Sequence, residues 1–265
     1  MIKSYLNFLL SRNPKLYETV LQFRKNFILE KVIFINLIQN SDIVLDIGAN
    51  KGYYTLLFSH LVGSRGEIHA FEPVLSTFEV LTKFISKHQK FDNIYLSNVG
   101  IANYNGKAII SIPDDDDGQA SLKTHNYGSW KEPKRISNYE IDLITLDSYK
   151  IFNKLNFIKC DVEGAELLVL EGARETIMKH HPIISLEISW EWTKDFGYNP
   201  INILQILSDF GYQQFYLFNT YLKLLESPHT YFSQVKFTGS VNLLCVIPNL
   251  HNSRIRKILK YVKFD

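Results

Sequence analysis

The chain has 265 residues, of which 46% are hydrophobic and 21% charged, a balance that excludes disordered and collagen-like proteins. Its 29 basic and 27 acidic side chains leave a net charge of +2, which gives no electrostatic reason to expect nucleic acid as the main partner. The length suits one domain of ordinary size with small extensions.

Strands and helices alternate in the first part of the chain. Residues 1–40 are predicted to be helical, because apolar side chains recur every three or four residues. The segments that follow are a strand "IVLDI", a helix over 53–62 ended by Gly63, a strand "EIHAFEP", a helix over 75–88 and a strand "NIYLSNV". This order predicts a parallel sheet with helices on both faces.

The middle of the chain departs from this alternation. The pair Asn105-Gly106, just before "KAIISIP", predicts a β-hairpin. Residues 113–135 are polar and contain two glycines and two prolines, and we expect a surface loop that is mobile without ligand and covers the site as a lid. The segment "YEIDLITLDSY" is the next predicted strand.

The alternation then resumes. The strands "LNFIKCD" and "PIISLEIS" flank one predicted helix, "GAELLVLEGARETIMKHH", and a further helix, "NPINILQILSDFGY", precedes the strands "QQFYLF" and "VNLLCVIP". The predicted fold class is α/β, with a doubly wound, Rossmann-like, mostly parallel sheet. We divide the chain into a helical N-terminal extension (1–40), one domain (41–248) and a basic C-terminal helix (249–265).

The segment "DIGANKG" lies where the first strand ends, at the edge where parallel sheets bind ligands. An NAD-type fingerprint requires glycines two and five residues after Gly48, but Asn50 and Tyr53 stand there. A P-loop is excluded as well, because no Gly-Lys-Ser/Thr follows the strand. The loop therefore does not fit either class of phosphate-bearing cofactor.

Two carboxylates at strand ends favour a different ligand. Asp46 precedes Gly48 by two residues, and it would repel a pyrophosphate but suits a positively charged amino group. Glu72 ends the second strand, where a carboxylate can accept hydrogen bonds from both hydroxyls of a ribose. The structural alternatives are a helix cap for Asp46 and a solvated loop carboxylate for Glu72. A ligand with an ammonium group, a ribose and no phosphates fits S-adenosylmethionine.

Six segments occur in a characteristic order: "VLDIGANKGYYT", "HAFEP", "GKAIISIP…QASL", "ITLDSY", "FIKCDVEGAELLVLEGA" and "PIISLEI". Together they resemble the FkbM-type family of S-adenosylmethionine-dependent methyltransferases, over roughly residues 43–190. The resemblance implies a Rossmann-like methyltransferase fold, S-adenosyl-L-methionine as cofactor, methyl transfer mostly to oxygen, and a small-molecule or glycan acceptor. The segments outside it, at the two ends of the chain, are expected to help define the acceptor.

The resemblance also implies roles for single residues. The cofactor-binding residues would be Asp46 as the anchor of the methionine part, Gly48, Ala49 and Asn50 as the loop around it, Glu72 at the ribose, Asn98 and Ile101 at the adenine, and Asp161 beside the transferred methyl group.

A second group of polar residues follows two later strands. Lys159 and Asp161 share one face of "IKCD", and Glu187 lies in an apolar run where a carboxylate needs a partner such as Lys159, a metal or a substrate hydroxyl. Asp161 or Glu187 is the predicted base for a hydroxyl acceptor. In the alternative, Asp161, Glu163 and Glu187 hold Mg²⁺. We favour the metal-free version, because the ligand spacing is not compact.

Three histidines are further candidate bases. His125 lies in the polar loop and reaches the site if that loop is a lid, whereas His180 and His181 are predicted to be structural, at the end of a helix.

O-methylation of a sugar, glycan or related small molecule is the leading hypothesis. The alternatives are N-methylation of an amine or protein side chain, and a catalytically inactive module that binds S-adenosylmethionine. Cys160 and Cys245 lie in apolar runs, and the N-terminus lacks a signal-peptide cleavage site, so we expect a cytoplasmic protein. The basic tail is expected to pack on the domain; the alternative is peripheral contact with the inner face of a membrane that carries a lipid-linked glycan.

Overall fold

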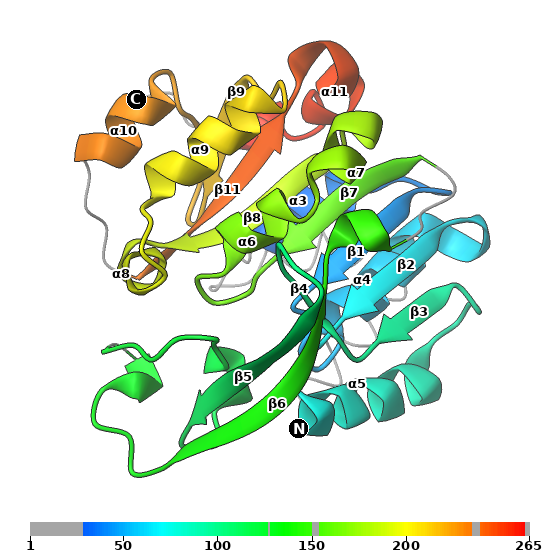
Figure 1. Cartoon of the computed structure of the whole chain (residues 1–265). Coiled ribbons are helices and arrows are strands. Elements are labelled where there is room, and N and C mark those ends of the chain that lie inside the picture. Colours follow the sequence, from blue (N-terminus) through cyan, green and yellow to red (C-terminus); the bar gives the residue numbers. More distant parts are fainter. Residues whose placement is uncertain (1–28, 127, 150–153, 235–238, 263–265) are drawn as a thin grey trace.

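The computed structural model describes residues 29–126, 128–149, 154–234 and 239–262 (Figure 1). Its main sheet has eight strands among these residues. From one edge to the other they are β10 (Leu222–Leu224), β9 (Gln214–Phe218), β11 (Ser240–Val246), β8 (Ile183–Ser189), β7 (Leu155–Cys160), β1 (Ile43–Ile47), β2 (Glu67–Phe71) and β3 (Ile94–Ser97).

Five neighbouring strands of this sheet, β3, β2, β1, β7 and β8, are parallel. The strand β11 runs antiparallel to β8 on one side and to β9 on the other, and β10 is antiparallel to β9. The predicted Rossmann-like fold with a mostly parallel sheet is confirmed. The parallel register pairs Asp46 with Lys159, so both side chains leave the sheet on the same face.

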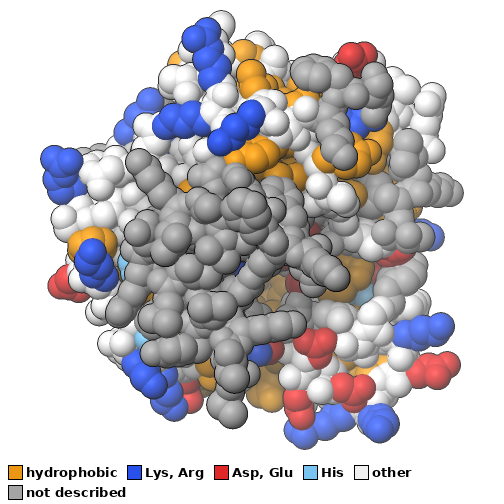
Figure 2. Space-filling model, turned by 180° about the vertical axis from the view of Figure 1, so that it is seen from behind, with side chains coloured by type: hydrophobic (Ala, Val, Ile, Leu, Met, Phe, Trp, Pro, Cys, Tyr) orange, Lys and Arg blue, Asp and Glu red, His pale blue; other side chains and the backbone are white. Residues whose placement is uncertain are grey.

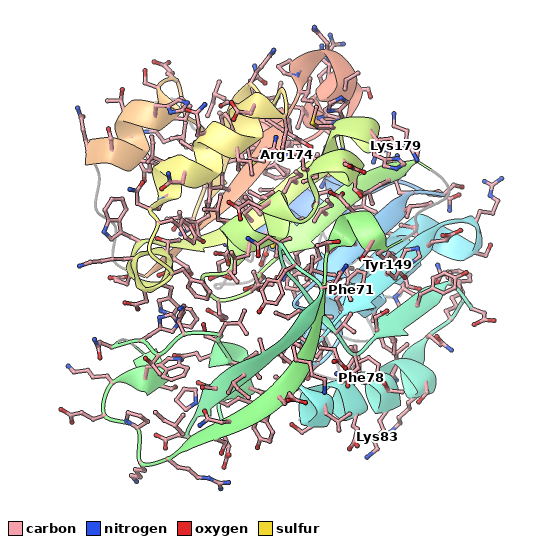
Figure 3. The ribbon with its side chains drawn as sticks, viewed as in Figure 1. Phe71, Phe78, Lys83, Tyr149, Arg174 and Lys179 are labelled. Carbon is pink, nitrogen blue, oxygen red and sulfur yellow. The ribbon has the colours of Figure 1, made fainter. Side chains whose placement is uncertain are left out.

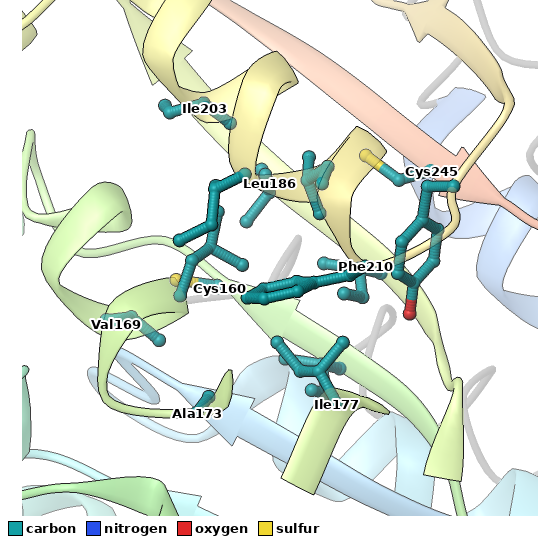
Figure 4. Packing of buried hydrophobic residues seen from close by; sticks show 14 of the residues in the cluster. Cys160, Val169, Ala173, Ile177, Leu186, Ile203, Phe210 and Cys245 are labelled. Carbon is teal, nitrogen blue, oxygen red and sulfur yellow. The ribbon is translucent and has the colours of Figure 1, made fainter. Parts of the chain in front are cut away.

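Helices cover both faces of the sheet. They are α3 (Leu29–Leu37), α4 (Tyr53–Val62), α5 (Leu75–His88), α6 (Glu166–Glu171), α7 (Arg174–His180), α8 (Trp190–Asp195), α9 (Pro200–Asp209), α10 (Pro228–Gln234) and α11 (Pro248–Ile255). On one face, residues of α6, α7 and α9 pack in a cluster that also contains Cys160 and Cys245 (Figure 4). On the other face, residues of α3, α4 and α11 form a second cluster. Every residue of β1 is buried because both faces are covered.

A second, three-stranded sheet lies beside the main one, and its strand order differs from the predicted hairpin. Strands β4 (Gly100–Ile101) and β5 (Gly106–Pro113) do not pair with each other; both pair with β6 (Ile136–Ile144), β4 in parallel and β5 antiparallel. The prediction of a hairpin at the Asn-Gly pair is therefore wrong, because β6 fills the position between these strands.

The helix expected after β7 is also different, since α6 and α7 are two short helices that meet at Gly172. A Cβ atom on Gly172 would lie 1.9 Å from the carbonyl oxygen of Ala102, which follows β4. The close approach of the small sheet at this point accounts for the break and for the glycine.

The C-terminal segment packs on the domain. The helix α11 ends at Ile255, and both Ile255 and Ile258 are buried against the rest of the domain. Arg254 binds Asp42 through both guanidinium nitrogens, with Nη2 2.8 Å from Oδ1. Residues 263–265, and 1–28 of the predicted N-terminal extension, lie outside the described residues.

No helix of the described segments is long and apolar enough to cross a membrane. Seen from behind, Lys and Arg side chains are spread over several parts of the visible surface, and they mix with Asp and Glu at the lower right (Figure 2).

Candidate active site

A pocket lies at the carboxyl ends of β1, β2 and β7, and its empty volume of about 740 Å³ includes space that is open to solvent. Its polar side chains include Glu72 after β2, Asp161 and Glu163 after β7, and Asp117 from the 113–135 loop. Apolar walls come from the small sheet, including Ile101. The predicted position at the strand ends is where this pocket lies, since parallel strands end at one common edge.

The loop after β1 forms the floor of the pocket. Gly48 has φ 79°, and a Cβ atom there would overlap the backbone of Asp161, so the position requires glycine. Asn50 also has a positive φ, of 47°, and its backbone nitrogen donates to Oε2 of Glu72 at 3.0 Å. Gly48 and Asn50 line the pocket, whereas Ala49 is buried beneath it.

Glu72 links the two strand ends. Its carboxylate accepts hydrogen bonds from the backbone nitrogens of Asn50 (3.0 Å) and Val74 (2.9 Å). Burial raises its pKa to about 7, although both hydrogen bonds favour the charged form. Its backbone carbonyl accepts from Nδ2 of Asn98 at 2.8 Å. Asn98 thus supports the turn from behind, while Ile101, the other residue predicted near adenine, lines the pocket.

Asp46 is fully buried below this loop and does not line the pocket. Its Oδ2 accepts from the hydroxyl of Thr55 at 2.6 Å, and burial raises the pKa of the carboxyl. Its Oδ1 has no hydrogen-bond partner among the residues that the structure describes. A buried oxygen without a partner at this place leaves an acceptor for a ligand amino group.

Lys159 forms an ion pair with Asp161 at the carboxyl end of β7. The Nζ of Lys159 lies 3.0 Å from Oδ2 of Asp161, and the lysine is only 4% exposed. Burial alone would lower the pKa of Lys159, but the carboxylates of Asp161, Asp46 and Glu30 together outweigh it and raise the pKa. Lys159 is therefore an ammonium ion, and Asp161, not Lys159, faces the pocket.

Glu187 lies in a neighbouring pocket, which shares Glu163 with the first. The hydroxyl of Ser240 donates to the Glu187 carboxylate. Burial, then the charge of Asp161, raises the pKa of Glu187 to about 7 and that of Glu163 to about 10. At neutral pH Glu163 is therefore protonated, whereas the pH is close to the pKa of Glu187. Across the described chain, no three His, Cys, Asp or Glu side chains are grouped to hold a metal ion.

The loop over 113–135 forms one wall of the pocket, with Asp117 and Ser121 among its lining residues. The carboxylate of Asp117 contacts Nζ of Lys51 at 2.9 Å, next to the loop after β1. On the other side, the hydroxyl of Ser121 donates to the backbone carbonyl of Glu163 at 3.0 Å. The loop therefore closes against both ends of the pocket, as a lid would; its mobility stays a prediction.

His125 fastens the loop and does not line the pocket. Its Nδ1 lies 2.7 Å from the Asp195 carboxylate on α8, and its Nε2 lies 2.9 Å from the hydroxyl of Ser121. The ring is buried and stacks on Trp192 at 4.3 Å. His180 accepts a hydrogen bond from the backbone of Leu155, which is a structural contact.

Several residues of the site were not predicted from the sequence. Phe71 ends β2, lines the pocket and contacts the ring of Tyr149 edge to face, with centroids 5.0 Å apart (Figure 3). Asp117, Ser121 and Asp195 also lacked a signal, because their roles depend on where an irregular loop settles. The acidic run "DDDD" was the nearest signal for Asp117.

The lining residues fit S-adenosylmethionine. No Lys, Arg or His of the described residues lines the pocket, so it offers no counter-charge for phosphates. Its carboxyl groups suit a positively charged ligand, and Glu72 sits where the ribose hydroxyls of a nucleoside would be accepted.

Three solved structures are among those similar to this chain. A methyltransferase FkbM from Methylobacillus flagellatus has 18% identity and a TM-score of 0.49, covering 90% of this chain, which spans 52% of that protein. A putative rRNA-methylase from Clostridium thermocellum has 13% identity and a TM-score of 0.47, over 80% of this chain and 91% of that one. Aeropyrum pernix fibrillarin with bound S-adenosyl-L-methionine has 12% identity and a TM-score of 0.44, over 89% and 76%.

The comparison with curated proteins found no match. In the comparison with protein families, residues 46–213, more than half of the chain, match the family described as "Methyltransferase FkbM domain".

Proposed function

Since the chain belongs to the FkbM family of S-adenosylmethionine-dependent methyltransferases, we propose that it methylates a hydroxyl group of a sugar, a glycan or a related small molecule. The observation that carries the proposal is the carboxyl pair beside the pocket. Asp161 faces the pocket, and Glu187, with a pKa raised by burial to about 7, lies in the space next to it. A base of that pKa is well matched to neutral pH.

S-adenosylmethionine supplies an electrophilic methyl group on a positively charged sulfur atom. The loop of Gly48 and Asn50 would hold the methionine part above the buried Asp46, whose Oδ1 lacks a partner among the described residues, and Glu72 would accept from the ribose hydroxyls. The apolar wall near Ile101 would cover the adenine. Because the leaving group is already good, the chain's part is to position the acceptor and take its proton.

Glu187 is the proposed base, and Asp161 orients the acceptor hydroxyl from the pocket side. Glu163, whose pKa is raised to about 10 by burial and by Asp161, is protonated at neutral pH and donates a hydrogen bond to an acceptor oxygen. A hydroxyl proton then passes to the Glu187 carboxylate as the oxygen attacks the methyl group.

N-methylation is the second candidate, because the carboxyl groups of the pocket also suit an amine acceptor. An amine that arrives neutral needs no strong base, so its methylation would be insensitive to the loss of Glu187. A module without catalysis would bind the cofactor and turn nothing over.

Two measurements test the proposal. Calorimetry is expected to show binding of S-adenosylmethionine and S-adenosylhomocysteine but not of NAD. Mass spectrometry of glycans and small metabolites, from cells with the active protein and with Asp161→Asn, is expected to show an oxygen-linked methyl group only in the first. Binding of NAD alone, or a new methyl group on nitrogen, contradicts the proposed O-methylation.

A further inference from the structure

The helix α3 lies before the residues matched by the family, and it reaches the same face of the sheet as Asp46 and Lys159. Its second residue, Glu30, is partly buried. The hydroxyl of Tyr54, on α4, donates to the Glu30 carboxylate. Tyr54 belongs to the segment that directly follows the loop below the pocket, so this contact ties α3 to the site.

The ammonium group of Lys159 in turn lies over the ring of Tyr54. The Nζ of Lys159 lies 5.2 Å from the centre of this ring and 3.0 Å from the Asp161 carboxylate. A cation over the face of an aromatic ring is attracted to it, and more strongly where water is excluded, as it is around a lysine that is 4% exposed. The contacts form one continuous path from Glu30 to the pocket.

We propose that Glu30 is a positioning residue of the active site: through Tyr54 it fixes the ammonium group of Lys159, and through Lys159 it fixes the Asp161 carboxylate at the pocket. The inference deepens the proposed function and rests on it for the identity of the ligand. It assigns part of the site to a helix outside the segment that defines the family.

Acidic groups from four parts of the fold interact with Lys159. They are Glu30 on α3, Asp46 on β1, Asp161 and the protonated Glu163 after β7, and Glu187 on β8. Even without Glu163, these acidic groups outnumber the two lysines near Tyr54, Lys159 and Lys31, so the site attracts positive charge. Removing the Glu30 charge, or its hold on Tyr54, weakens this attraction and loosens Asp161.

The test compares two ligands that differ in one methyl group and one charge. S-adenosylmethionine carries a sulfonium ion, whereas S-adenosylhomocysteine is neutral at sulfur. Both are titrated by calorimetry at pH 8 into the full chain and into Glu30→Gln, Tyr54→Phe and the double variant. Glu67→Gln, a carboxylate that contacts His69 on β2, is the control.

We expect each single variant to lower the preference for the methylated ligand by about three- to tenfold, with S-adenosylhomocysteine bound within about twofold of its original affinity. The double variant should fall no further, because both substitutions break one path. Asp161→Asn removes the carboxylate itself, so it gives the largest loss of preference for the methylated ligand with which the other variants are compared.

An unchanged preference in both single variants overturns the inference. So does an equal loss of affinity for the two ligands together with a lower melting temperature, because a purely structural role acts on both alike. If one variant fails to fold, the other decides. If the unsubstituted protein binds neither ligand, the proposed function fails instead.

Discussion

A Cβ atom on residue 48 would lie 1.9 Å from the carbonyl oxygen of Asp161, because the backbone of Gly48 rests directly on that peptide group. The contact fixes the loop after β1 against the turn after β7. Both strands therefore present their ends to the pocket at a set separation, and the loop cannot shift without moving Asp161.

We expect Gly48→Ala to displace this loop and weaken S-adenosylmethionine binding by at least about tenfold. The control is Gly197→Ala, because Gly197 has nearly the same φ (82°) but a Cβ atom there would meet nothing within 4 Å. Both variants bear the cost of a side chain at positive φ, roughly 1–2 kcal/mol, so calorimetry isolates the contact with Asp161. Equal affinities of the two variants would count against a tight fit at Gly48.

Glu166 gives a prediction for the pH dependence of stability. It is 1% exposed and burial raises its pKa from 4.5 to about 7. The folded protein thus holds this proton more tightly than the unfolded chain, so its contribution to stability is present at low pH and lost as pH rises through about 7. Glu72 and Glu187 shift in the same direction.

We expect Glu166→Gln, which keeps the shape and removes the charge, to be more stable than the original protein at pH 8.5 by on the order of 3 kcal/mol and to match it at pH 4.5. Urea unfolding at both pH values measures this difference. Glu171→Gln, at an exposed position of the same helix, is the control and should change little. A constant difference across pH would show that the charge of Glu166 is not the cause.

The proposed base is tested by Glu187→Gln and Asp161→Asn. Each keeps the shape of the side chain but cannot accept a proton, so we expect intact binding of S-adenosylhomocysteine and a loss of turnover of about 100- to 10,000-fold. The control is Glu191→Gln, which changes another carboxylate of the neighbouring pocket. Rates within about threefold of the original would exclude both residues from the proton transfer and favour N-methylation.

The Mg²⁺ alternative predicts a different result. If Asp161, Glu163 and Glu187 hold a metal, turnover disappears with a chelator and returns with Mg²⁺, and each substitution raises the Mg²⁺ requirement. We expect no effect of chelation, because these three carboxyl groups are not grouped, among the described residues, in a way that could hold a metal ion.

The 113–135 loop is predicted to open before ligand leaves. Asp117→Asn removes the ion pair with Lys51, so we expect S-adenosylhomocysteine to be released faster. The release can be measured by tryptophan fluorescence, because Trp130 and Trp192 contact His125 of this loop. Asp115→Asn, at an exposed position of the same loop, is the control. Limited proteolysis adds a second readout: a loop cut equally with and without ligand is not a lid.

The sequence predicted the elements that follow simple periodic rules. Strand β1 and helices α4 and α5 have the expected residues, since alternation of apolar segments and glycine or proline boundaries is local. The hairpin at Asn105-Gly106 failed because pairing with β6 is a long-range contact that local turn chemistry does not report. The break at Gly172 has the same cause, the approach of Ala102.

The sequence predicted those parts of the site that lie directly at the ends of strands. Glu72, Asp161 and the loop of Gly48 lie at one edge because parallel strands end together. The sequence could not separate residues that face the pocket from those that support it. Asp46 and Lys159 lie below the loop, and Asn98 holds the turn at Glu72. Glu30 and Asp195 were not found, because contacts from distant helices leave no local pattern.

The position of β11 means that the main sheet cannot be completed until this strand has been synthesised. This strand fills the gap between β8 and β9, yet it is made after both of them. Until Val246 has left the ribosome, β8 is an edge strand with four isoleucine and leucine side chains prepared for burial, Ile183, Ile184, Leu186 and Ile188. Such an edge pairs readily with other chains. A chain that stops before Ser240 should therefore aggregate, because β11 is needed to close the gap between β8 and β9.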